Sequence, residues 1–311
     1  MGYKLQMFSL EAEEPYPNPP SLDPPMEYLV VALIGVVFAI ASLVLLSLGL
    51  AIIYGMMGVI NLAQGEFIML GAYTVVLSSA HGLDLWVGMA LAPVVVGVVG
   101  LVVERCIIRF LSGRLLDTML ATWGLSLGLI AAVTLIIGPS TEGVATPFGH
   151  VAIGGYAVSA YNLFVIAATG FLVALTWGLF NRTRFGLIAR GAMQNADMVA
   201  VLGIHPPTIY MVTFALGSAL AGLAGAIMAP LTGVVPSLGL AFVAKVFITV
   251  TVGGAAIFSG TLGAGTLLGA IESAVSFVST PIYGQVAMLG SALVVLRFAP
   301  QGISGLWRRS D

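Results

Sequence analysis

The chain has 311 residues, of which 59% are hydrophobic and only 8% are charged, and its formal net charge is -2. Soluble globular domains carry about a quarter charged residues, so this composition excludes a soluble enzyme or binding domain and indicates a membrane protein. Eleven basic against 13 acidic residues give no reason to expect a nucleic-acid partner. Cys106 is the only cysteine, and no two histidines have the spacing of metal ligands, so we expect no metal site.

The first 27 residues differ from everything that follows. Acidic residues alternate there with prolines, from Glu11 to Pro25. This mixture is typical of a solvated, disordered tail, and it lacks the basic start and early apolar run of a secretory signal peptide. We expect residues 28–304 to form one transmembrane domain, followed by a short basic cytoplasmic tail at residues 305–311.

Hydropathy predicts an all-α polytopic membrane protein with about nine helices crossing the membrane, and eight to ten also fit because glycines interrupt two segments. The charge-free runs at residues 28–53, 85–103 and 118–137 are continuously apolar, unlike the alternating strands of a membrane β-barrel. On one of them, Gly217, Ala221 and Gly225 recur every four residues, which predicts close helix packing. The expected spans are 28–49, 51–80 (interrupted), 84–104, 117–137, 161–180, 209–230, 242–258, 262–280 and 284–299.

The basic residues predict the orientation. Nine of the eleven fall in three clusters, which begin at Arg105, Arg182 and Arg297. Cytoplasmic loops are enriched in Lys and Arg, and an even number of expected spans separates each cluster from the next, so all three clusters can lie in the cytoplasm. The loops at 138–160 and 231–241 then face outside. The side of the amino terminus depends on whether residues 51–80 cross once.

A polar break near residues 58–67 interrupts the second apolar region. It contains Asn61, Gln64, Gly65 and Glu66. Polar groups and a glycine at membrane depth are tolerated where the backbone faces protein or a watery cavity, and transporters use such breaks to line substrate paths. We therefore predict that these four residues line or gate a translocation path. A break that serves architecture alone is the alternative.

The same region carries a family resemblance. It resembles the motif of permease subunits of branched-chain amino acid and urea-type ABC importers, which is close to G-x-x-N-L-A-x-G-x-x-x-x-L-G-A. The resemblance continues at residues 117–127, 183–195, 202–204, 213–225, 252–254, 260–263 and 300–302, so it covers nearly the whole chain after residue 45. It departs at residues 255–258 and at Gly191, which leaves the substrate open. The motif is matched by Gly58, Asn61, Leu62, Ala63, Gly65, Leu70, Gly71 and Ala72.

The resemblance implies a permease subunit of an importer for small polar solutes in the bacterial inner membrane. Branched-chain or other amino acids, or urea and short amides, are the implied substrates. The implied partners are a second homologous permease, two cytoplasmic ATPases that use ATP and Mg, and a periplasmic solute-binding protein. This chain has no phosphate loop and no H-E-x-x-H, so we expect no catalytic residue and no cofactor. The alternative is a self-sufficient channel or secondary transporter.

Residues 181–208 form the longest predicted cytoplasmic connection between membrane spans. A helix is expected from residue 187 to 202, because Gly203 and Pro206 end it. A short amphipathic helix here suits either docking on a partner or a solvated connector. The resemblance identifies it as the coupling helix that contacts the ATPase, and the residues we assign to that contact are Arg184, Gly186, Arg190, Met193, Gln194, Asn195 and Asp197.

Two further charges lie in apolar surroundings. Charges within membrane spans are expensive and are normally paired or turned toward water. We expect Lys245 to extend toward the outer interface, while three roles stay open for Glu272. It could pair with a partner subunit, bond within the bundle or line the path.

Overall fold

The computed structural model describes residues 26–307 except 112, 154–155 and 255, and for 153, 306 and 307 the backbone alone. The predicted tail at residues 1–27 therefore lies outside the described part, apart from its last two residues, and so do Arg308 and Arg309. The first long helices are α1 (Met26–Met57), α2 (Gln64–Ala80), α3 (Leu85–Val103) and α5 (Leu115–Ile136). Between α3 and α5 lie a π-helical turn η1 (Glu104–Ile108) and α4 (Arg109–Leu111).

The second half begins with a hairpin of two antiparallel strands, β1 (His150–Ile153) and β2 (Tyr156–Ser159), in which His150 pairs with Ser159. The helices that follow are α6 (Ala160–Arg182), α7 (Arg184–Gln194), α8 (Ala196–Val201), α9 (Pro206–Met228), α10 (Leu238–Gly253), α11 (Ile257–Val278), α12 (Pro281–Phe298) and α13 (Ile303–Trp307). A 3-10 turn η2 (Ala229–Leu231) extends α9. The hairpin falls in the predicted outer loop at 138–160.

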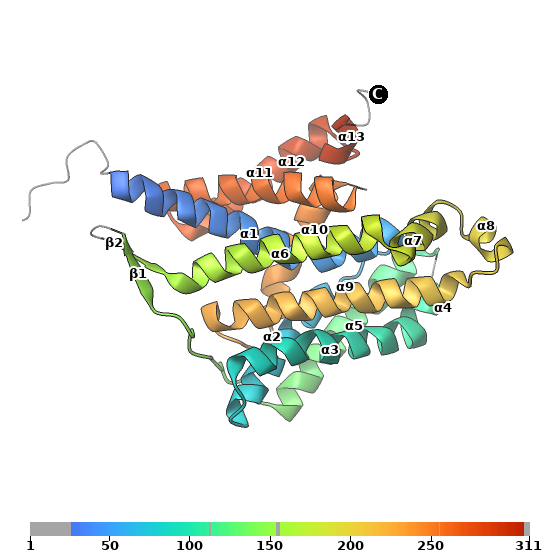
Figure 1. Cartoon of the computed structure of the whole chain (residues 1–311), viewed down its shortest axis with the longest axis horizontal. Coiled ribbons are helices and arrows are strands. Elements are labelled where there is room, and N and C mark those ends of the chain that lie inside the picture. Colours follow the sequence, from blue (N-terminus) through green and yellow to red (C-terminus); the bar gives the residue numbers. More distant parts are fainter. Residues whose placement is uncertain (1–25, 112, 154–155, 255, 308–311) are drawn as a thin grey trace, which may run out of the picture.

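The all-α polytopic membrane fold is confirmed. In the part that the structure describes, seven helical segments are long and apolar enough to cross a membrane. Each of the nine predicted spans coincides with a helix, but α2 with 17 residues and α10 with 16 are shorter than the rest. The count of nine crossings is therefore not established. Figure 1 shows α10 crossing the long helices steeply instead of running beside them.

The break predicted near residues 58–67 is present, but the predicted boundary between the first two spans, near residue 50, was wrong. Helix α1 does not end near residue 49 but continues to Met57, and the non-helical stretch is 58–63, so Gln64, Gly65 and Glu66 form the first turn of α2. The physical reason is Gly58, which has a φ of +62° and ends α1. Its amide donates to the Tyr54 carbonyl at 2.9 Å.

The two ends of the bundle differ in the way that the basic clusters predict. Figure 1 shows α4, α7, α8 and α13 gathered toward one end, and the hairpin with the start of α1 at the other. The first end carries Arg109, Arg190 and the chain that follows Arg297. At the opposite end, the Tyr28 and Tyr156 rings lie 6.0 Å apart and hold α1 against the hairpin. This arrangement agrees with one cytoplasmic side for the basic clusters.

Helix α9 lies at the centre of the packing, against α1, α2 and α3. Backbones touch where small residues face one another. A Cβ atom on Gly71 of α2 would overlap the backbone of Gly222 in α9, and one on Gly225 would overlap the Ile68 carbonyl. Within lipid, where apolar surface gains nothing from leaving water, dispersion at such close contacts holds helices together. The small-residue pattern on α9 therefore forms the centre of the bundle.

This packing gives a first prediction. Gly71→Leu inserts four carbons where the Gly222 backbone leaves no room, so it should cost about 1–3 kcal/mol of stability, or disrupt the fold. The measurement is the apparent melting temperature of the purified protein in detergent. Gly170→Leu on α6 is the matched control, because a Cβ there meets nothing within 4 Å. Equal melting temperatures for the two variants would contradict the packing.

Candidate functional site

The break between α1 and α2 is built by its own polar side chains. The Asn61 Oδ1 atom accepts a hydrogen bond from the Ala63 amide at 3.1 Å, which turns the chain into α2. The Asn61 Nδ2 atom lies 3.5 Å from Gln64 Oε1. The Leu62 amide donates to Thr122 Oγ1 of α5 at 3.1 Å. Backbone groups that the break frees from helical bonding thus find partners inside the protein, as hydrocarbon requires.

Glu66 lies in the first turn of α2, directly after the break, and is fully buried. Its Oε1 atom accepts a hydrogen bond of 2.7 Å from the Ser126 hydroxyl in α5. Its Oε2 atom is buried without a hydrogen-bond partner among the described residues, and so is Gln64 Nε2. The carboxylate is in the first turn of α2, where the amide groups of a helix favour negative charge.

The first turns of α2 and α10 meet at this point. A Cβ on Gly65 would overlap the Gly239 carbonyl, and a Cβ on Gly239 would overlap the Glu66 carboxylate. The two helix starts therefore touch backbone to backbone, with Glu66 enclosed between them. The four residues predicted for the path, Asn61, Gln64, Gly65 and Glu66, come together here and are buried within the subunit.

Two cavities lie beside the break. One of about 80 Å³ is lined by Leu50, Tyr54, Ile60, Phe247, Val250 and Thr251. The other, of about 460 Å³, is lined by Tyr54, Gly55, Met56, Met57, Gly58, Ile60, Leu115, Met193 and Tyr210. Tyr54 and Ile60 line both, whereas Asn61, Gln64 and Glu66 line neither. The cavities therefore border the break at Gly58 and Ile60 and not at its buried polar side chains.

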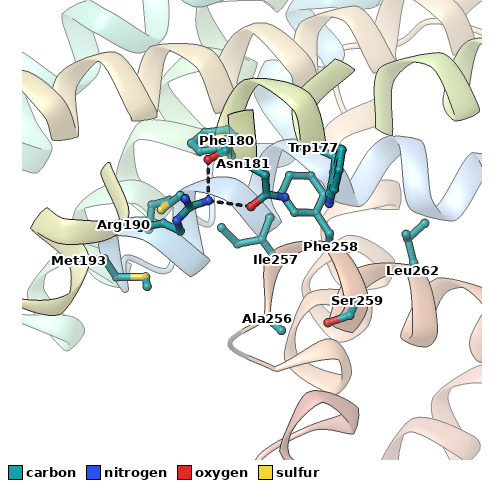
Figure 2. A pocket seen from close by; sticks show the side chains of 11 residues that line it. Trp177, Phe180, Asn181, Arg190, Met193, Ala256, Ile257, Phe258, Ser259 and Leu262 are labelled. Atoms are coloured by element: carbon teal, nitrogen blue, oxygen red, sulfur yellow. Dashed lines mark hydrogen bonds between the residues drawn. The ribbon is translucent and has the colours of Figure 1, made fainter. Parts of the chain in front are cut away.

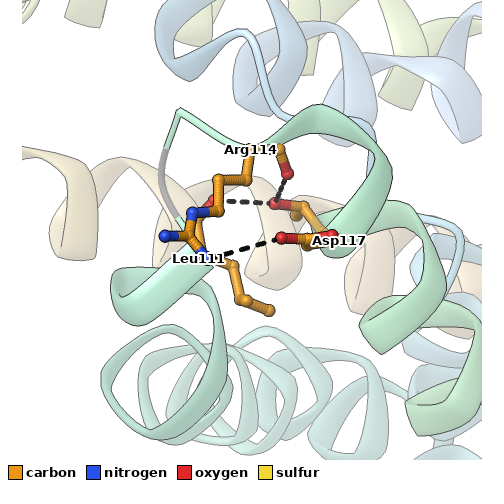
Figure 3. A network of polar contacts seen from close by, with 4 residues as sticks. Leu111, Arg114 and Asp117 are labelled. Atoms are coloured by element: carbon orange, nitrogen blue, oxygen red, sulfur yellow. Dashed lines mark hydrogen bonds and ion pairs between the residues drawn. The ribbon is translucent and has the colours of Figure 1, made fainter.

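Helix α5 is positioned by polar contacts at its start and along one face. The Thr118 hydroxyl donates to the Leu111 and Arg114 carbonyls at 3.0 and 2.8 Å, and the Arg114 guanidinium lies 3.7 Å from the Asp117 carboxylate (Figure 3). Thr118, Thr122 and Ser126 are buried at intervals of four residues. That spacing puts their hydroxyls on one helix face, toward the break.

The predicted coupling segment is two helices, not one. The single helix expected over 187–202 is wrong, because α7 ends at Gln194 and α8 begins at Ala196. Asn195 causes the division, since its side chain caps α8 by accepting from the Met198 amide at 3.0 Å. On α8 and just after it, Met198, Val201 and Leu202 are exposed, and Val201 has 82% of its surface free.

Arg190 is turned inward rather than outward. Its Nη1 atom donates to the Phe180 carbonyl and to Asn181 Oδ1, both at 2.6 Å (Figure 2). A Cβ on Gly186 would overlap the same Phe180 carbonyl, so α7 lies against the end of α6. The Tyr210 hydroxyl of α9 donates to the Ala192 carbonyl at 3.1 Å. Helix α7 is thereby bonded to both α6 and α9.

The other predicted coupling residues are placed differently. Arg184, Met193, Gln194, Asn195 and Asp197 are exposed at this end of the bundle. Met193 also borders a cavity of about 510 Å³ between α7 and the start of α11. Ile257 and Phe258 of α11 line the same cavity (Figure 2). A cavity of about 330 Å³ next to α8 is lined by Glu104, Arg109, Ala196, Asp197, Ala200, Pro206, Pro207 and Tyr210.

The prediction was that Lys245 extends toward the outer interface, and the structure instead shows it paired. Its Nζ atom forms an ion pair of 2.5 Å with Glu272 Oε1. The pair joins α10 to α11, so a bond within the bundle is the one of the three contacts left open for Glu272 that the structure shows. Elsewhere, the described residues contain no group of three His, Cys, Asp or Glu side chains that could hold a metal ion.

Comparison with known proteins decides the family. Residues 32–296 match the family described as "Branched-chain amino acid transport system / permease component". The chain belongs to this family. No solved structure matches it. The permease motif quoted from residues 58–72 thus falls in a chain whose match extends over nearly all of its membrane helices.

Curated relatives agree with the assignment. The branched-chain amino acid permease BraD of Pseudomonas aeruginosa is 30% identical over 84% of this chain and 91% of its own. The permease LivH of Methanocaldococcus jannaschii is 28% identical over 86% of this chain and 90% of its own. LivM of Salmonella typhimurium is 26% identical over 85% of this chain and 68% of its own. The chain is thus a multi-pass membrane permease of this family.

Sequence reasoning missed the partners of the break. Ser126, Thr122 and Gly239 complete the site from α5 and α10. A signal was present for two of them, because hydroxyl residues four apart in an otherwise apolar span indicate a polar helix face. Gly239 carried none, since one glycine near a helix start has many uses.

The Glu66 contact gives a second prediction. Ser126→Ala removes the one described donor to the Glu66 carboxylate and leaves it buried, which should cost about 1–3 kcal/mol of stability. Thr134→Ala on the same helix is the control, because that hydroxyl donates only to the Ile130 carbonyl of its own helix. Melting in detergent compares the two. A loss no larger in the Ser126 variant than in the control would contradict the role of this bond.

Proposed function

We propose that this chain is one of the membrane permeases of an ATP-driven importer for branched-chain amino acids in a bacterial inner membrane. Its partners would be a second, homologous permease, two cytoplasmic ATPases that use ATP and Mg, and a periplasmic solute-binding protein. The relatives described above are named for branched-chain amino acid transport, which favours that substrate class over urea or short amides. The presence of LivH-like and LivM-like relatives supports a pair of permeases.

The observation that carries the coupling role is the placement of α7 and α8. They lie at the basic end of the bundle, and none of the described elements covers Met198 and Val201 of α8, which are exposed. Exposed apolar side chains clustered among polar ones are typical of a docking surface for another protein. A self-sufficient channel would not need such a surface.

A movement of α7 would reach the break through a short series of contacts. Arg190 fixes α7 to the end of α6, and Tyr210 fixes it to α9. Helix α9 in turn packs directly on α2 through Gly222 and Gly225. ATP-driven closure of the ATPases would thus shift α9 against α2 and alternate the access of the path at residues 58–66. Closely packed cores transmit such shifts because they deform little.

This proposal predicts a separable defect. Arg190→Glu combined with Met193→Ala should abolish the bonds to α6 and remove an exposed contact, so that solute-stimulated ATP hydrolysis and uptake both fall at least tenfold. The measurement uses the reconstituted complex in vesicles with labelled leucine. Arg182→Glu is the matched charge reversal, because that guanidinium lies over the Trp177 ring and no bond to α7 is described for it.

Docking of the solute-binding protein should survive in the Arg190 variant, since that surface is on the other side of the membrane. Undiminished uptake in this variant would remove the coupling role. Full leucine uptake by the wild type without ATP would instead end the importer proposal and favour a channel or secondary transporter.

A further inference from the structure

The Lys245–Glu272 pair lies within the membrane-spanning part of the chain. Lys245 is the eighth of the 16 residues of α10, and Glu272 is six residues from the end of α11 at Val278. Six helical residues span about 9 Å, so Glu272 lies about 9 Å along the helix axis from the end of α11, within its apolar segment. The pair joins two helices of the bundle, whereas the Arg114–Asp117 ion pair lies at the start of a single helix.

The pair is not sealed inside the subunit. The side chains of Lys245 and Glu272 are 26% and 18% exposed, whereas Glu66 is completely covered. Hydrocarbon cannot solvate a charge, so intramembrane charges that reach a subunit surface face water or protein. Helix α12 shows the contrast, because its exposed side chains Leu293, Val286 and Ile282 are apolar, as contact with lipid requires. The surface at Lys245 and Glu272 is therefore not a lipid-facing one.

Some of the residues near the pair along its two helices have small side chains. Ala241 and Ala244 are exposed on α10, and Ser273 and Ser276 are half-buried on α11. Side chains of this size leave room next to the two charges for the polar end of a small solute.

We propose that Lys245 and Glu272 form a transient binding site for the zwitterionic end of an amino acid on the translocation path. The ammonium group of Lys245 takes the carboxylate of the substrate, and the carboxylate of Glu272 takes its ammonium group. This inference rests on the proposed function, and it names the part of the substrate that the permease recognises.

The chemistry favours a zwitterion over an uncharged solute. An amino acid carries both charges across the membrane, and each must exchange water for a group of opposite sign. A cation next to an anion offers both partners in one place while the empty site stays neutral and internally paired. Because the substrate competes with the Lys245–Glu272 bond itself, binding is weak, and a path must release what it binds. Urea or a short amide needs no such pair.

The test compares two variants of the complete importer in vesicles. Lys245→Met with Glu272→Gln keeps the sizes and removes both charges, and leucine uptake should fall at least tenfold while the complex stays assembled. Lys245→Glu with Glu272→Lys keeps an ion pair but reverses the direction in which a zwitterion fits, so uptake should stay at least tenfold low. Wild-type uptake by either variant would overturn the proposal. Failure of the reversed variant to assemble would also overturn it, because the pair would then serve structure alone.

Access to water supplies a second readout. With Cys106→Ala as background, Glu272→Cys should react with a water-soluble maleimide in the assembled complex, and leucine should slow the reaction during ATP turnover. Leu293→Cys on α12 is the lipid-facing control and should not react. An unreactive Glu272→Cys would show that the second permease or lipid covers the site, and this would overturn the proposal. ATP-dependent leucine uptake by the wild type is measured before either variant is tested. Its absence would contradict the proposed function itself.

Discussion

The backbones of α2 and α10 touch at Gly65 and Gly239, and the arrangement of the polar break follows from that contact. Neither position has space for a Cβ atom, so the two helix starts can approach only with glycine on both sides. Their approach encloses Glu66, whose carboxylate needs a donor in a region without water and finds the Ser126 hydroxyl of α5. One close contact thus fixes α2, α5 and α10 relative to one another.

Hydrogen bonds explain why the break is stable although it interrupts a membrane helix. Hydrocarbon offers no partner to a free amide, so the polar groups at residues 58–63 must be satisfied by the protein. Asn61 supplies one acceptor from within the break, and Thr122 supplies another from α5. Helix α5 therefore holds the break mainly by hydrogen bonds. Such bonds can exchange partners in a transport cycle more easily than interdigitated apolar side chains can separate.

The sequence predicted the class of fold and the composition of the polar cluster, because both are local properties. A run of about twenty apolar residues predicts a membrane helix at any position in the chain. Asn61, Gln64 and Glu66 are conspicuous as polar residues in an apolar region. It did not predict what those residues touch. Ser126 lies 60 positions from Glu66, and Gly239 lies further still from Gly65, so no pattern within one helix reveals the contact.

The errors have equally specific causes. The apolar run continues without a change at residue 50, so hydropathy alone does not locate the end of α1, and we placed it too early. Gly58, with its positive φ, is where the helix ends. The coupling segment was predicted as one helix because Asn195 can continue a helix as well as cap the next, and its bond to the Met198 amide decides for the cap. Arg190 was expected to face a partner. Its inward bonds to Phe180 and Asn181 instead make it the connection between α7 and α6.

The central claim is that the break at residues 58–63 and the first turn of α2, closed in this conformation, open to water during transport. Asn61→Cys in a Cys106→Ala background tests it directly, since Asn61 is 1% exposed here. In the reconstituted importer, a water-soluble maleimide should leave this cysteine unlabelled at rest and should label it when ATP, the solute-binding protein and leucine are all present. Labelling that stays absent in every state of an actively transporting complex would contradict the claim and leave the break a purely architectural joint.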